Sequence, residues 1–271
     1  MRTPLLRRLA AALAALALVP AAVSATWSII AVDLRTGRVV ITSATCVAQA
    51  TFRDFPAAGL RDVQAIVVPG VGVAAAQAAA DRTRANQRLI ADELRAGTEP
   101  RLILEMLRED PDFQRRQFGI VDLRGRSAGF SGNQSLAASL SRQGQVPDTE
   151  IYYSIQGNIL ASDEVVLAAV RAIQTAGGDV LDKVMAAMEA ADAAGGDRRC
   201  TCETEPVSAA PCDGKNAHVA YLLGADRDDP ADRPFLYLDV TDENVRADEN
   251  ANPVVTLRLR FDAWRRAGGG P

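Results

Sequence analysis

The sequence predicts an α+β protein in which stacked β-sheets lie between layers of helices. One observation is a pair of hairpin patterns, the first directly after residue 25 and the second near the middle of the chain. Another is that two helical patterns follow each of two groups of strands. Because helices and antiparallel sheets each bury an apolar face, this order favours a layered sandwich. We expect a single domain over residues 26–271.

Alternating β-formers separated by turn residues predict the strands of the first half. We expect these strands at residues 27–33, 38–45, 64–68, 116–123 and 127–132. Helical periodicity that stops at Gly97 and at Pro111 predicts two helices, at residues 83–95 and 99–109. Residues 73–80 are small and apolar and fit either state, so their structure stays open.

The second half repeats this order and then becomes less regular. We expect a strand at residues 152–155, helices at 163–176 and 179–193, and strands at 217–224 and 235–240. Ser162 is placed to cap the first of these helices, and Gly195-Gly196 ends the second. A cysteine- and proline-rich loop at 198–216 separates the last helix from the last strands. The tail at 254–266 is amphipathic and fits a helix or an edge strand.

Residues 1–25 have the pattern of a secretory signal peptide. Arginines at positions 2, 7 and 8 precede an apolar run at 9–19, and Val23-Ser24-Ala25 supplies small residues before a cleavage site. The apolar run is short for a transmembrane anchor. We therefore expect cleavage after Ala25 and an exported protein, periplasmic or extracellular, that is not bound to a membrane after processing.

The composition excludes several classes of protein. With 48% hydrophobic and 24% charged residues, the chain is an ordinary globular one rather than disordered, collagen-like or coiled-coil. Without the three leader arginines, 27 basic residues face 34 acidic ones, a net charge of −7. A nucleic-acid binder needs the opposite balance to neutralise phosphates. We expect a small-molecule partner and no nucleic acid, and the sequence leaves a homo-oligomer open.

The sequence contains no pattern for a cofactor or a metal. His218 is the single histidine, which excludes a multi-histidine metal centre. Gly70-Val-Gly lacks the last glycine of a dinucleotide fingerprint, and the chain has no GxxxxGKS phosphate loop. We therefore expect chemistry that uses neither a cofactor nor a metal.

Four cysteines in an exported chain predict two disulfides. Cys200 and Cys202 are too close to pair with each other, which leaves two connectivities. We favour Cys46 with Cys200 and Cys202 with Cys212, the second closing a short loop. The alternative is a zinc site built from the three clustered cysteines and His218, but this spacing lacks a CxxC pair.

Cleavage after Ala25 would expose Thr26 as the first residue of a β-strand. An N-terminal threonine can serve as its own base, because an α-amine with a pKa of roughly 8 can accept the hydroxyl proton. This chemistry requires no histidine and no metal. The simpler alternative is that threonine is a good strand residue.

Five segments together resemble a known family. They begin at Thr26 (TWSIIAVDLRTGR), Pro69 (PGVGV), Arg116 (RQFGIVD), Gln156 (QGNILA) and Ala194 (AGGDRR). In order and spacing, from about Thr26 to Arg199, they are similar to the domain-of-unknown-function 1028 family. That family is placed in the N-terminal-nucleophile (Ntn) hydrolase superfamily. The resemblance implies a four-layer αββα sandwich and amide-bond hydrolysis by a terminal Thr, Ser or Cys, but no particular substrate.

The resemblance and the cleavage site agree on Thr26 as the candidate nucleophile. Relatives that begin Met-Thr-Phe-Ser would expose the same threonine by losing methionine. Many relatives have Ser-Lys after the second strand, whereas this chain has Thr45-Cys46. It therefore lacks a lysine that would lower the pKa of the nucleophile.

Asn158 is the second candidate catalytic residue. Its side-chain amide is placed to donate to a developing oxyanion, and the preceding Gly157 would allow close approach of the backbone. The alternative is a turn in which asparagine adopts a left-handed conformation.

Five further residues are candidates for substrate binding. Arg198 or Arg199, oriented by Asp197, would hold a substrate carboxylate or support the terminal amine. The alternative is a structural ion pair. Gln77 and Gln156 would line the pocket, although Gln77 suits a role in satisfying buried backbone equally well.

Two functional hypotheses follow from these residues. The first is an exported Ntn-type hydrolase that cleaves an amide bond in a small or peptide-like substrate with Thr26. The second is a disulfide-stapled binding or structural protein that keeps the same fold without turnover. Substitution of Thr26 by alanine separates them, because it would abolish activity under the first and leave ligand binding intact under the second.

Overall fold

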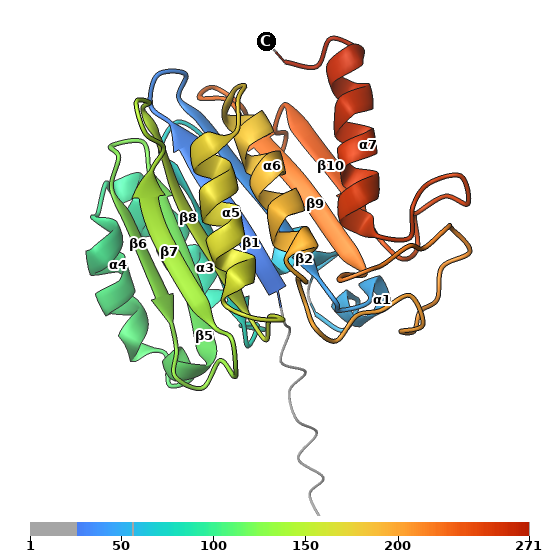
Figure 1. Ribbon diagram of the computed structural model, residues 1–271. Helices are drawn as coiled ribbons and strands as arrows, with labels where there is room; N and C mark the ends of the chain where they lie inside the picture. The colour runs from blue at the N-terminus through green and yellow to red at the C-terminus, as the bar shows by residue number, and fades with distance from the viewer. Residues whose placement is uncertain (1–25, 56, 271) are drawn as a thin grey trace, which may run out of the picture.

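The structure is a computed structural model that describes residues 26–55 and 57–270, so the expected signal peptide at 1–25 lies outside the described residues. Two antiparallel sheets stack on each other, and helices cover both outer faces (Figure 1). This arrangement is the expected α+β sandwich with four layers. Among the residues described, no helix has the length and apolar character needed to cross a membrane.

The larger sheet has six strands and the smaller has four. The larger consists of β1 (Thr26–Asp33), β2 (Arg38–Thr45), β7 (Leu140–Gln145), β8 (Ile151–Asn158), β9 (Val219–Ala225) and β10 (Leu236–Val240). The smaller consists of β3 (Ala65–Val68), β4 (Gly72–Ala78), β5 (Arg116–Asp122) and β6 (Ser127–Ser131). Their orders are β10-β9-β2-β1-β8-β7 and β3-β4-β5-β6. Because β1 lies inside the larger sheet, its first residue has a neighbouring strand on each side.

The longer helices form the outer layers (Figure 1). The larger sheet is covered by α5 (Glu164–Thr175), α6 (Val180–Ala193) and α7 (Pro253–Arg266). The smaller sheet is covered by α3 (Ala85–Ala96) and α4 (Pro100–Met106). Short turns of helix complete the connections: α1 (Gln49–Phe52), α2 (Leu60–Gln64), η1 (Leu107–Glu109) and η2 (Phe113–Arg115).

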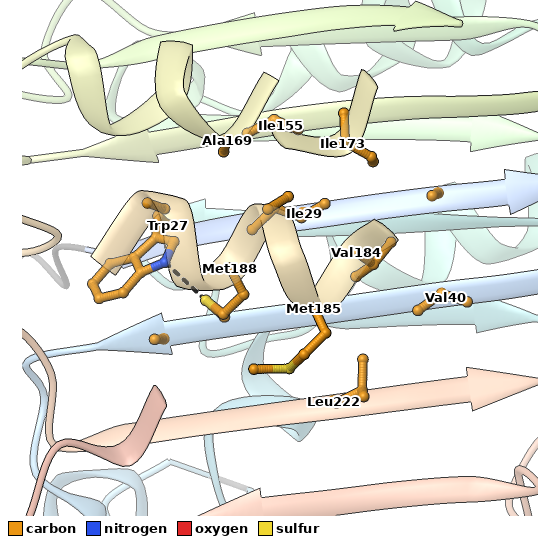
Figure 2. Packing of buried hydrophobic residues seen from close by; sticks show 14 of the residues in the cluster. Trp27, Ile29, Val40, Ile155, Ala169, Ile173, Val184, Met185, Met188 and Leu222 are labelled. Atoms are coloured by element: carbon orange, nitrogen blue, oxygen red, sulfur yellow. Dashed lines mark hydrogen bonds between the residues drawn. The ribbon is translucent and has the colours of Figure 1, made fainter. Parts of the chain in front are cut away.

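The alternation along β1 explains why both of its faces are buried. Trp27 and Ile29 point toward α6, whereas Ile30 and Val32 point toward the smaller sheet. Figure 2 shows the first of these cores, where the indole N–H of Trp27 donates to the sulfur of Met188 (2.9 Å). A strand buried on both faces is held firmly, so the position of Thr26 is fixed by the core behind it.

The helix ends follow the local sequence. Asp179 caps α6 by accepting hydrogen bonds from the N–H groups of Leu181 and Asp182, and the Asp182 carboxylate accepts from the Asp179 N–H. Before α5 the N–H of Glu164 donates to Ser162 Oγ (3.3 Å), but the residue at the N-cap is Asp163 rather than the predicted Ser162, and its side chain makes no capping bond. Pro253 begins α7, where its missing N–H costs nothing.

The structure resolves the elements that the sequence left open and adds others. Residues 73–80 contribute strand β4, and the tail forms helix α7. The sequence did not predict β7, α1 or α2. Strand β7 reads LSRQGQ and is a half-exposed edge strand, so it has little of the apolar alternation that marks inner strands. The two short helices are single turns, too short to show a helical period.

Both disulfides have the favoured connectivity. Cys46 is bonded to Cys200 and Cys202 to Cys212. The first joins the end of β2 to the segment after α6, and the second closes a loop within residues 198–216. The cysteine-rich loop is thus attached to the larger sheet at Cys46, the residue that follows Thr45.

Candidate active site

Polar residues form a row across the larger sheet at the end where β1 begins. Thr26 lies opposite Thr45 of β2 and opposite Asn158 of β8. The Thr26 hydroxyl donates a hydrogen bond to the Thr45 hydroxyl (Oγ1–Oγ1 3.2 Å). All three residues are buried, and Thr26 is 1% exposed. The structure therefore brings the two predicted catalytic residues, Thr26 and Asn158, into direct register on neighbouring strands.

Gln77 reaches this row from the smaller sheet. Its Nε2 donates to the backbone carbonyl of Thr26 (3.0 Å) and to Gln117 Oε1 (2.7 Å). Its Oε1 accepts from Ser28 Oγ (2.7 Å) and from Gln64 Nε2 (2.6 Å). Both ends of the Gln77 amide are thus engaged by protein groups, including the backbone of the candidate nucleophile.

Gln156 belongs to the same buried layer between the sheets. Its Nε2 donates to Ser28 Oγ (2.6 Å), and its Oε1 accepts from Ser154 Oγ (2.8 Å). Gly119 on β5 makes room for this amide, because a Cβ at that position would collide with Gln156 Oε1. Gln156 therefore lies behind the row and supports β1 two residues beyond Thr26.

Gln117 and Gln64 belong to this layer but are not among the predicted site residues. Gln117 Nε2 donates to the carbonyl of Gly157 (2.8 Å), and Gln64 Oε1 accepts from the Tyr221 hydroxyl (3.0 Å). For Gln117 a signal was available. Alternation along β5 places it on the face of Val121, which packs on the larger sheet, so a polar side chain there needs buried partners.

Asp197 and Arg199 form an ion pair beside the row. Arg199 Nη2 lies 2.8 Å from Asp197 Oδ2, and Arg199 Nε donates to Asp197 Oδ1 (3.0 Å). The same carboxylate accepts from the backbone N–H of Cys46 (3.2 Å), the residue after Thr45. Arg198 is exposed. Of the two arginines, Arg199 is thus the one that Asp197 orients.

The chain turns sharply between Asn158 and the segment of Asp197. Ile159 has a φ of 56°, in the left-handed region that a β-branched residue rarely adopts. Such strain costs roughly 1–3 kcal/mol and persists where the surroundings enforce it. Here the Ile159 N–H donates to the Ala137 carbonyl (3.1 Å), and Leu160 forms an isolated β-bridge with Asp197. The turn therefore joins the two segments that carry the predicted site residues.

His218 and Lys215 form a second buried cluster near the row. His218 Nδ1 lies 3.3 Å from Lys215 Nζ, and the His218 N–H donates to the Thr45 carbonyl (2.8 Å). Burial, together with the charge of Lys215, lowers the pKa of His218, and burial also lowers the pKa of Lys215. A ring nitrogen of His218 lies within 4.8 Å of the sulfurs of Cys46 and Cys200. Those sulfurs are bonded to each other, so they are not the thiolates that the zinc alternative requires.

A cavity of about 260 Å³ lies on the face of the larger sheet that is turned toward the smaller sheet. It is lined by β9, which is two strands away from β1 and Thr26. Val219, which is opposite Thr45 in register, lines it together with the aromatic rings of Tyr221 and Tyr237. The guanidinium of Arg61 lies over the Tyr237 ring, 4.9 Å from its centroid. The cavity thus offers aromatic surface within a short distance of the row, and the positive charge of Arg61 is accompanied there by the carboxylates of Asp62 and Asp239.

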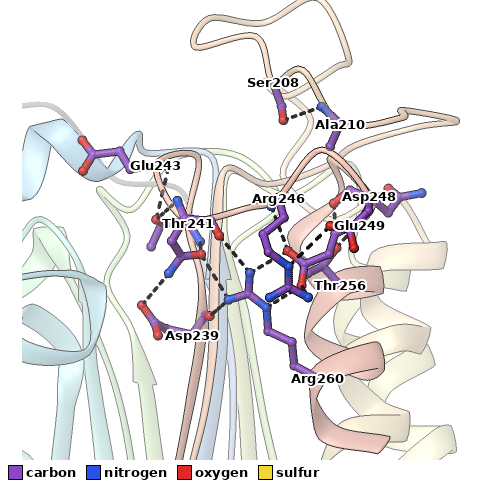
Figure 3. Close-up of polar contacts among 12 residues, drawn as sticks. Ser208, Ala210, Asp239, Thr241, Glu243, Arg246, Asp248, Glu249, Thr256 and Arg260 are labelled. Atoms are coloured by element: carbon purple, nitrogen blue, oxygen red, sulfur yellow. Dashed lines mark hydrogen bonds and ion pairs between the residues drawn. The ribbon is translucent and has the colours of Figure 1, made fainter. Parts of the chain in front are cut away.

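The wall of this cavity at β10 is fixed by Arg260 of α7 (Figure 3). Arg260 donates to Glu249 Oε1 and Oε2 (2.9 and 2.7 Å) and to the backbone carbonyl of Asp239 (2.5 Å). The hydrogen bond from Arg260 lowers the pKa of Glu249, so this carboxylate stays ionised and bonded at neutral pH. Helix α7 is thereby tied to the strand that carries Tyr237 and Asp239.

The chain is similar to known proteins in its family and in its fold. A family model described as a family of unknown function (DUF1028) matches residues 26–211. The crystal structure of a DUF1028 protein from Silicibacter pomeroyi superposes with a TM-score of 0.63 and 21% sequence identity, and the match covers 89% of each chain. No curated protein matches the sequence. At this identity the crystal structure supports the fold alone.

Proposed function

The chain belongs to the DUF1028 family, whose function is unknown, and from its site we propose that it is an exported hydrolase that cleaves an amide bond. Thr26, exposed by removal of a signal peptide at residues 1–25, would be the nucleophile in an Ntn-type mechanism. The observation that carries this proposal is the register at the head of β1. There Thr26 meets the Thr45 hydroxyl on one strand and Asn158 on the other.

The proposed reaction uses the hydroxyl and the α-amine of Thr26. The amine accepts the hydroxyl proton while Oγ1 attacks the substrate carbonyl carbon. The resulting ammonium then protonates the leaving nitrogen, the C–N bond breaks, and the acyl group stays on Oγ1 as an ester. Water, deprotonated by the same amine, attacks this ester and releases the acid, which regenerates Thr26.

Asn158 would stabilise the negative charge that develops on the carbonyl oxygen. Its place directly opposite Thr26 is supported on three sides, by the β1–β8 pairing, by the Gln117 bond to Gly157 and by the turn at Ile159. A preorganised donor of this kind typically contributes about 3–4 kcal/mol to transition-state stabilisation.

Substrate recognition would involve the ion pair and the cavity. The Arg199 side chain is 37% exposed while Asp197 is fully buried, so Arg199 is oriented from the protein side and accessible to a carboxylate. The cavity lined by Tyr221, Tyr237 and Arg61 is large enough for one side chain. These features favour a small or peptide-like substrate.

A binding or structural protein without turnover is the second candidate function. It is favoured by the Thr45-Cys46 pair in place of Ser-Lys, and by the disulfide that ties Cys46 to Cys200. Under this alternative, Asp197 and Arg199 would serve only to anchor the loop after α6.

Intact mass and N-terminal sequencing of the exported, non-reduced protein form the first test. We expect a chain that starts at Thr26 and is lighter than its thiol form by four hydrogen atoms. Such a protein is then assayed against a panel of aminoacyl and peptidyl anilides. We expect turnover by the wild type, none by Thr26→Ala, and partial turnover by Thr26→Ser.

Thr36→Ala is the matched control, because Thr36 lies in the turn at the opposite end of the same hairpin. It should hydrolyse the panel like the wild type. A different N-terminus, or turnover by Thr26→Ala equal to that of the wild type, would contradict the hydrolase proposal. The binding or structural protein would then be the favoured function.

A further inference from the structure

Two side-chain amides connect the backbone at Thr26 to the backbone at Asn158. Gln77 Nε2 donates to the Thr26 carbonyl (3.0 Å) and to Gln117 Oε1 (2.7 Å), and Gln117 Nε2 donates to the Gly157 carbonyl (2.8 Å). The amides thus form a bridge from the peptide group that follows Thr26 to the one that precedes Asn158. The bridge comes from the smaller sheet and crosses to the larger one.

The bridge is buried and its own atoms are held in place. Gln77 is 6% exposed and Gln117 is fully buried. Gln77 Oε1 accepts from Ser28 and Gln64, and Gln117 Nε2 also donates to Ser131 Oγ (2.7 Å). Each amide therefore has to supply an acceptor on one side and donors on the other. An amide does this, whereas an ionised carboxylate offers acceptors only and an aliphatic side chain offers neither.

The bridge matters because Thr26 would lose an anchor on processing. Once residue 25 is removed, no peptide bond precedes Thr26, and its orientation depends on the strand pairing and on what binds its carbonyl. Catalytic groups act within narrow limits, since a misplacement of ~1 Å can lower the rate roughly 100-fold. A hydrogen bond to the Thr26 carbonyl restricts rotation of the residue that carries both the amine and the hydroxyl.

We infer that Gln77 and Gln117 are positioning residues, which set the orientation of Thr26 relative to Asn158 without touching the substrate. This inference rests on the proposed function. It assigns Gln77 to the support of the site rather than to its lining, and it adds Gln117.

Periodate oxidation tests the orientation of Thr26 without any substrate. Periodate cleaves the Cα–Cβ bond of an N-terminal threonine, and this requires the amine and hydroxyl to be accessible and side by side. The exported protein is treated in native buffer, and conversion is followed by intact mass. We expect slow oxidation of the wild type, because Thr26 is only 1% exposed to the reagent. Oxidation of Gln117→Leu and Gln77→Leu should be at least tenfold faster, because Thr26 is held less firmly in these variants and reaches solvent more often.

Gln117→Glu supplies a readout that a general loss of structure would not give. When the introduced carboxyl is protonated, it can donate to the Gly157 carbonyl as the amide does; when it is ionised, it cannot. Relative to the wild type at the same pH, we expect oxidation of this variant to be slow at low pH and to accelerate as pH rises through the pKa of the introduced carboxyl. Gln117→Leu should be fast throughout.

Gln87→Glu and Gln87→Leu are the matched controls. Gln87 is also buried and donates to a backbone carbonyl, that of Val63 (2.8 Å), but it lies on α3 in the outer layer. Both controls should oxidise like the wild type. If folded Gln117→Leu, or folded Gln117→Glu at high pH, oxidises no faster than the wild type, the inference is wrong, whereas the hydrolase proposal is unaffected. If the denatured wild type resists periodate, its N-terminus is not Thr26, and both the inference and the proposed function are wrong.

Discussion

The carboxylate of Asp197 connects the segment after α6 to the end of β2, near Thr26. It is fully buried, it accepts from the Cys46 N–H, and it pairs with the guanidinium of Arg199. Burying a charge is unfavourable unless hydrogen bonds and an opposite charge compensate for it, and both are present here. The segment after α6 is therefore held against the end of β2 by a charge-assisted contact as well as by a disulfide.

Asp197→Ala should lower the free energy of unfolding by about 1–3 kcal/mol, because it leaves the Cys46 N–H buried without its acceptor. Urea denaturation at neutral pH measures the change. Asp232→Ala, at an exposed residue whose contact with Arg233 spans 4.0 Å, should leave the free energy of unfolding unchanged. Equal effects of the two substitutions would contradict the role given to Asp197.

The candidate site residues that the sequence predicted are those that lie in a segment with a recognisable pattern. Thr26 follows a predicted cleavage site, and Asn158 and Asp197 lie in two specific strings. The sequence did not predict Gln117, because it reaches the site only through Gln77 of β4 and through the Gly157 carbonyl of β8, and β8 belongs to the other sheet. Alternation along β5 marks Gln117 as a buried polar residue, but it does not identify the strand of the other sheet that carries its partner.

Buried secondary-structure elements were predicted from the sequence more accurately than exposed ones. Inner strands such as β1 and β2 are rich in β-forming residues and are bounded by turn residues, so their limits were predicted to within one residue. Strand β7 lies at the edge of its sheet with a polar sequence, and it was missed. Residues 73–80 could not be assigned locally, because Val-Ala-Ala-Ala suits either state. Pairing with β3 and β5 on both sides makes this segment a strand.

The connection between α4 and β5 is held by a buried ion pair. Arg116 Nε lies 3.0 Å from Asp110 Oδ2, and Asn86 of α3 donates to the same oxygen. Burial alone would raise the pKa of Asp110. Hydrogen bonds from Asn86, from the Asp112 N–H and from Arg116 outweigh it and hold the pKa below the ordinary value of 3.8. The ionised form of Asp110 is therefore favoured by folding.

A lowered pKa in the folded state gives a contribution to stability that is present above pH 3.8 and is lost as pH falls through the folded value. Asp110→Asn should therefore be less stable than the wild type at pH 7, and the difference should shrink as pH falls below 3.8. Urea denaturation across this range measures it. Asp92→Asn, at an exposed pair with Arg95, should show no such trend. A constant difference for Asp110→Asn would show that its charge is not what matters.

For the molecule as a whole, the two disulfides close loops of very different length. Cys46 and Cys200 are 154 residues apart, and Cys202 and Cys212 are 10 apart. In the chain-entropy model the longer loop contributes about 5 kcal/mol and the shorter about 3 kcal/mol. The first bond also links the two halves of the larger sheet, since it joins β2 to the segment that leads into β9.

Replacing Cys46 and Cys200 together by serine should therefore lower the free energy of unfolding more than replacing Cys202 and Cys212. Urea denaturation of the two double variants, each with its remaining disulfide confirmed by mass, compares them directly. The reverse order would indicate that the 198–216 loop contributes more to stability than its length implies.

The position of β1 has a practical consequence. The strand runs between β2 and β8, so anything attached ahead of Thr26 must leave the molecule beside Thr45 and Asn158. A purification tag or surface-immobilisation handle placed there would cap the amine and crowd the entrance to the row. Helix α7 ends at Arg266 on the opposite side of the molecule (Figure 1). Affinity handles and fluorescent reporters therefore belong after α7, where they leave the head of β1 open.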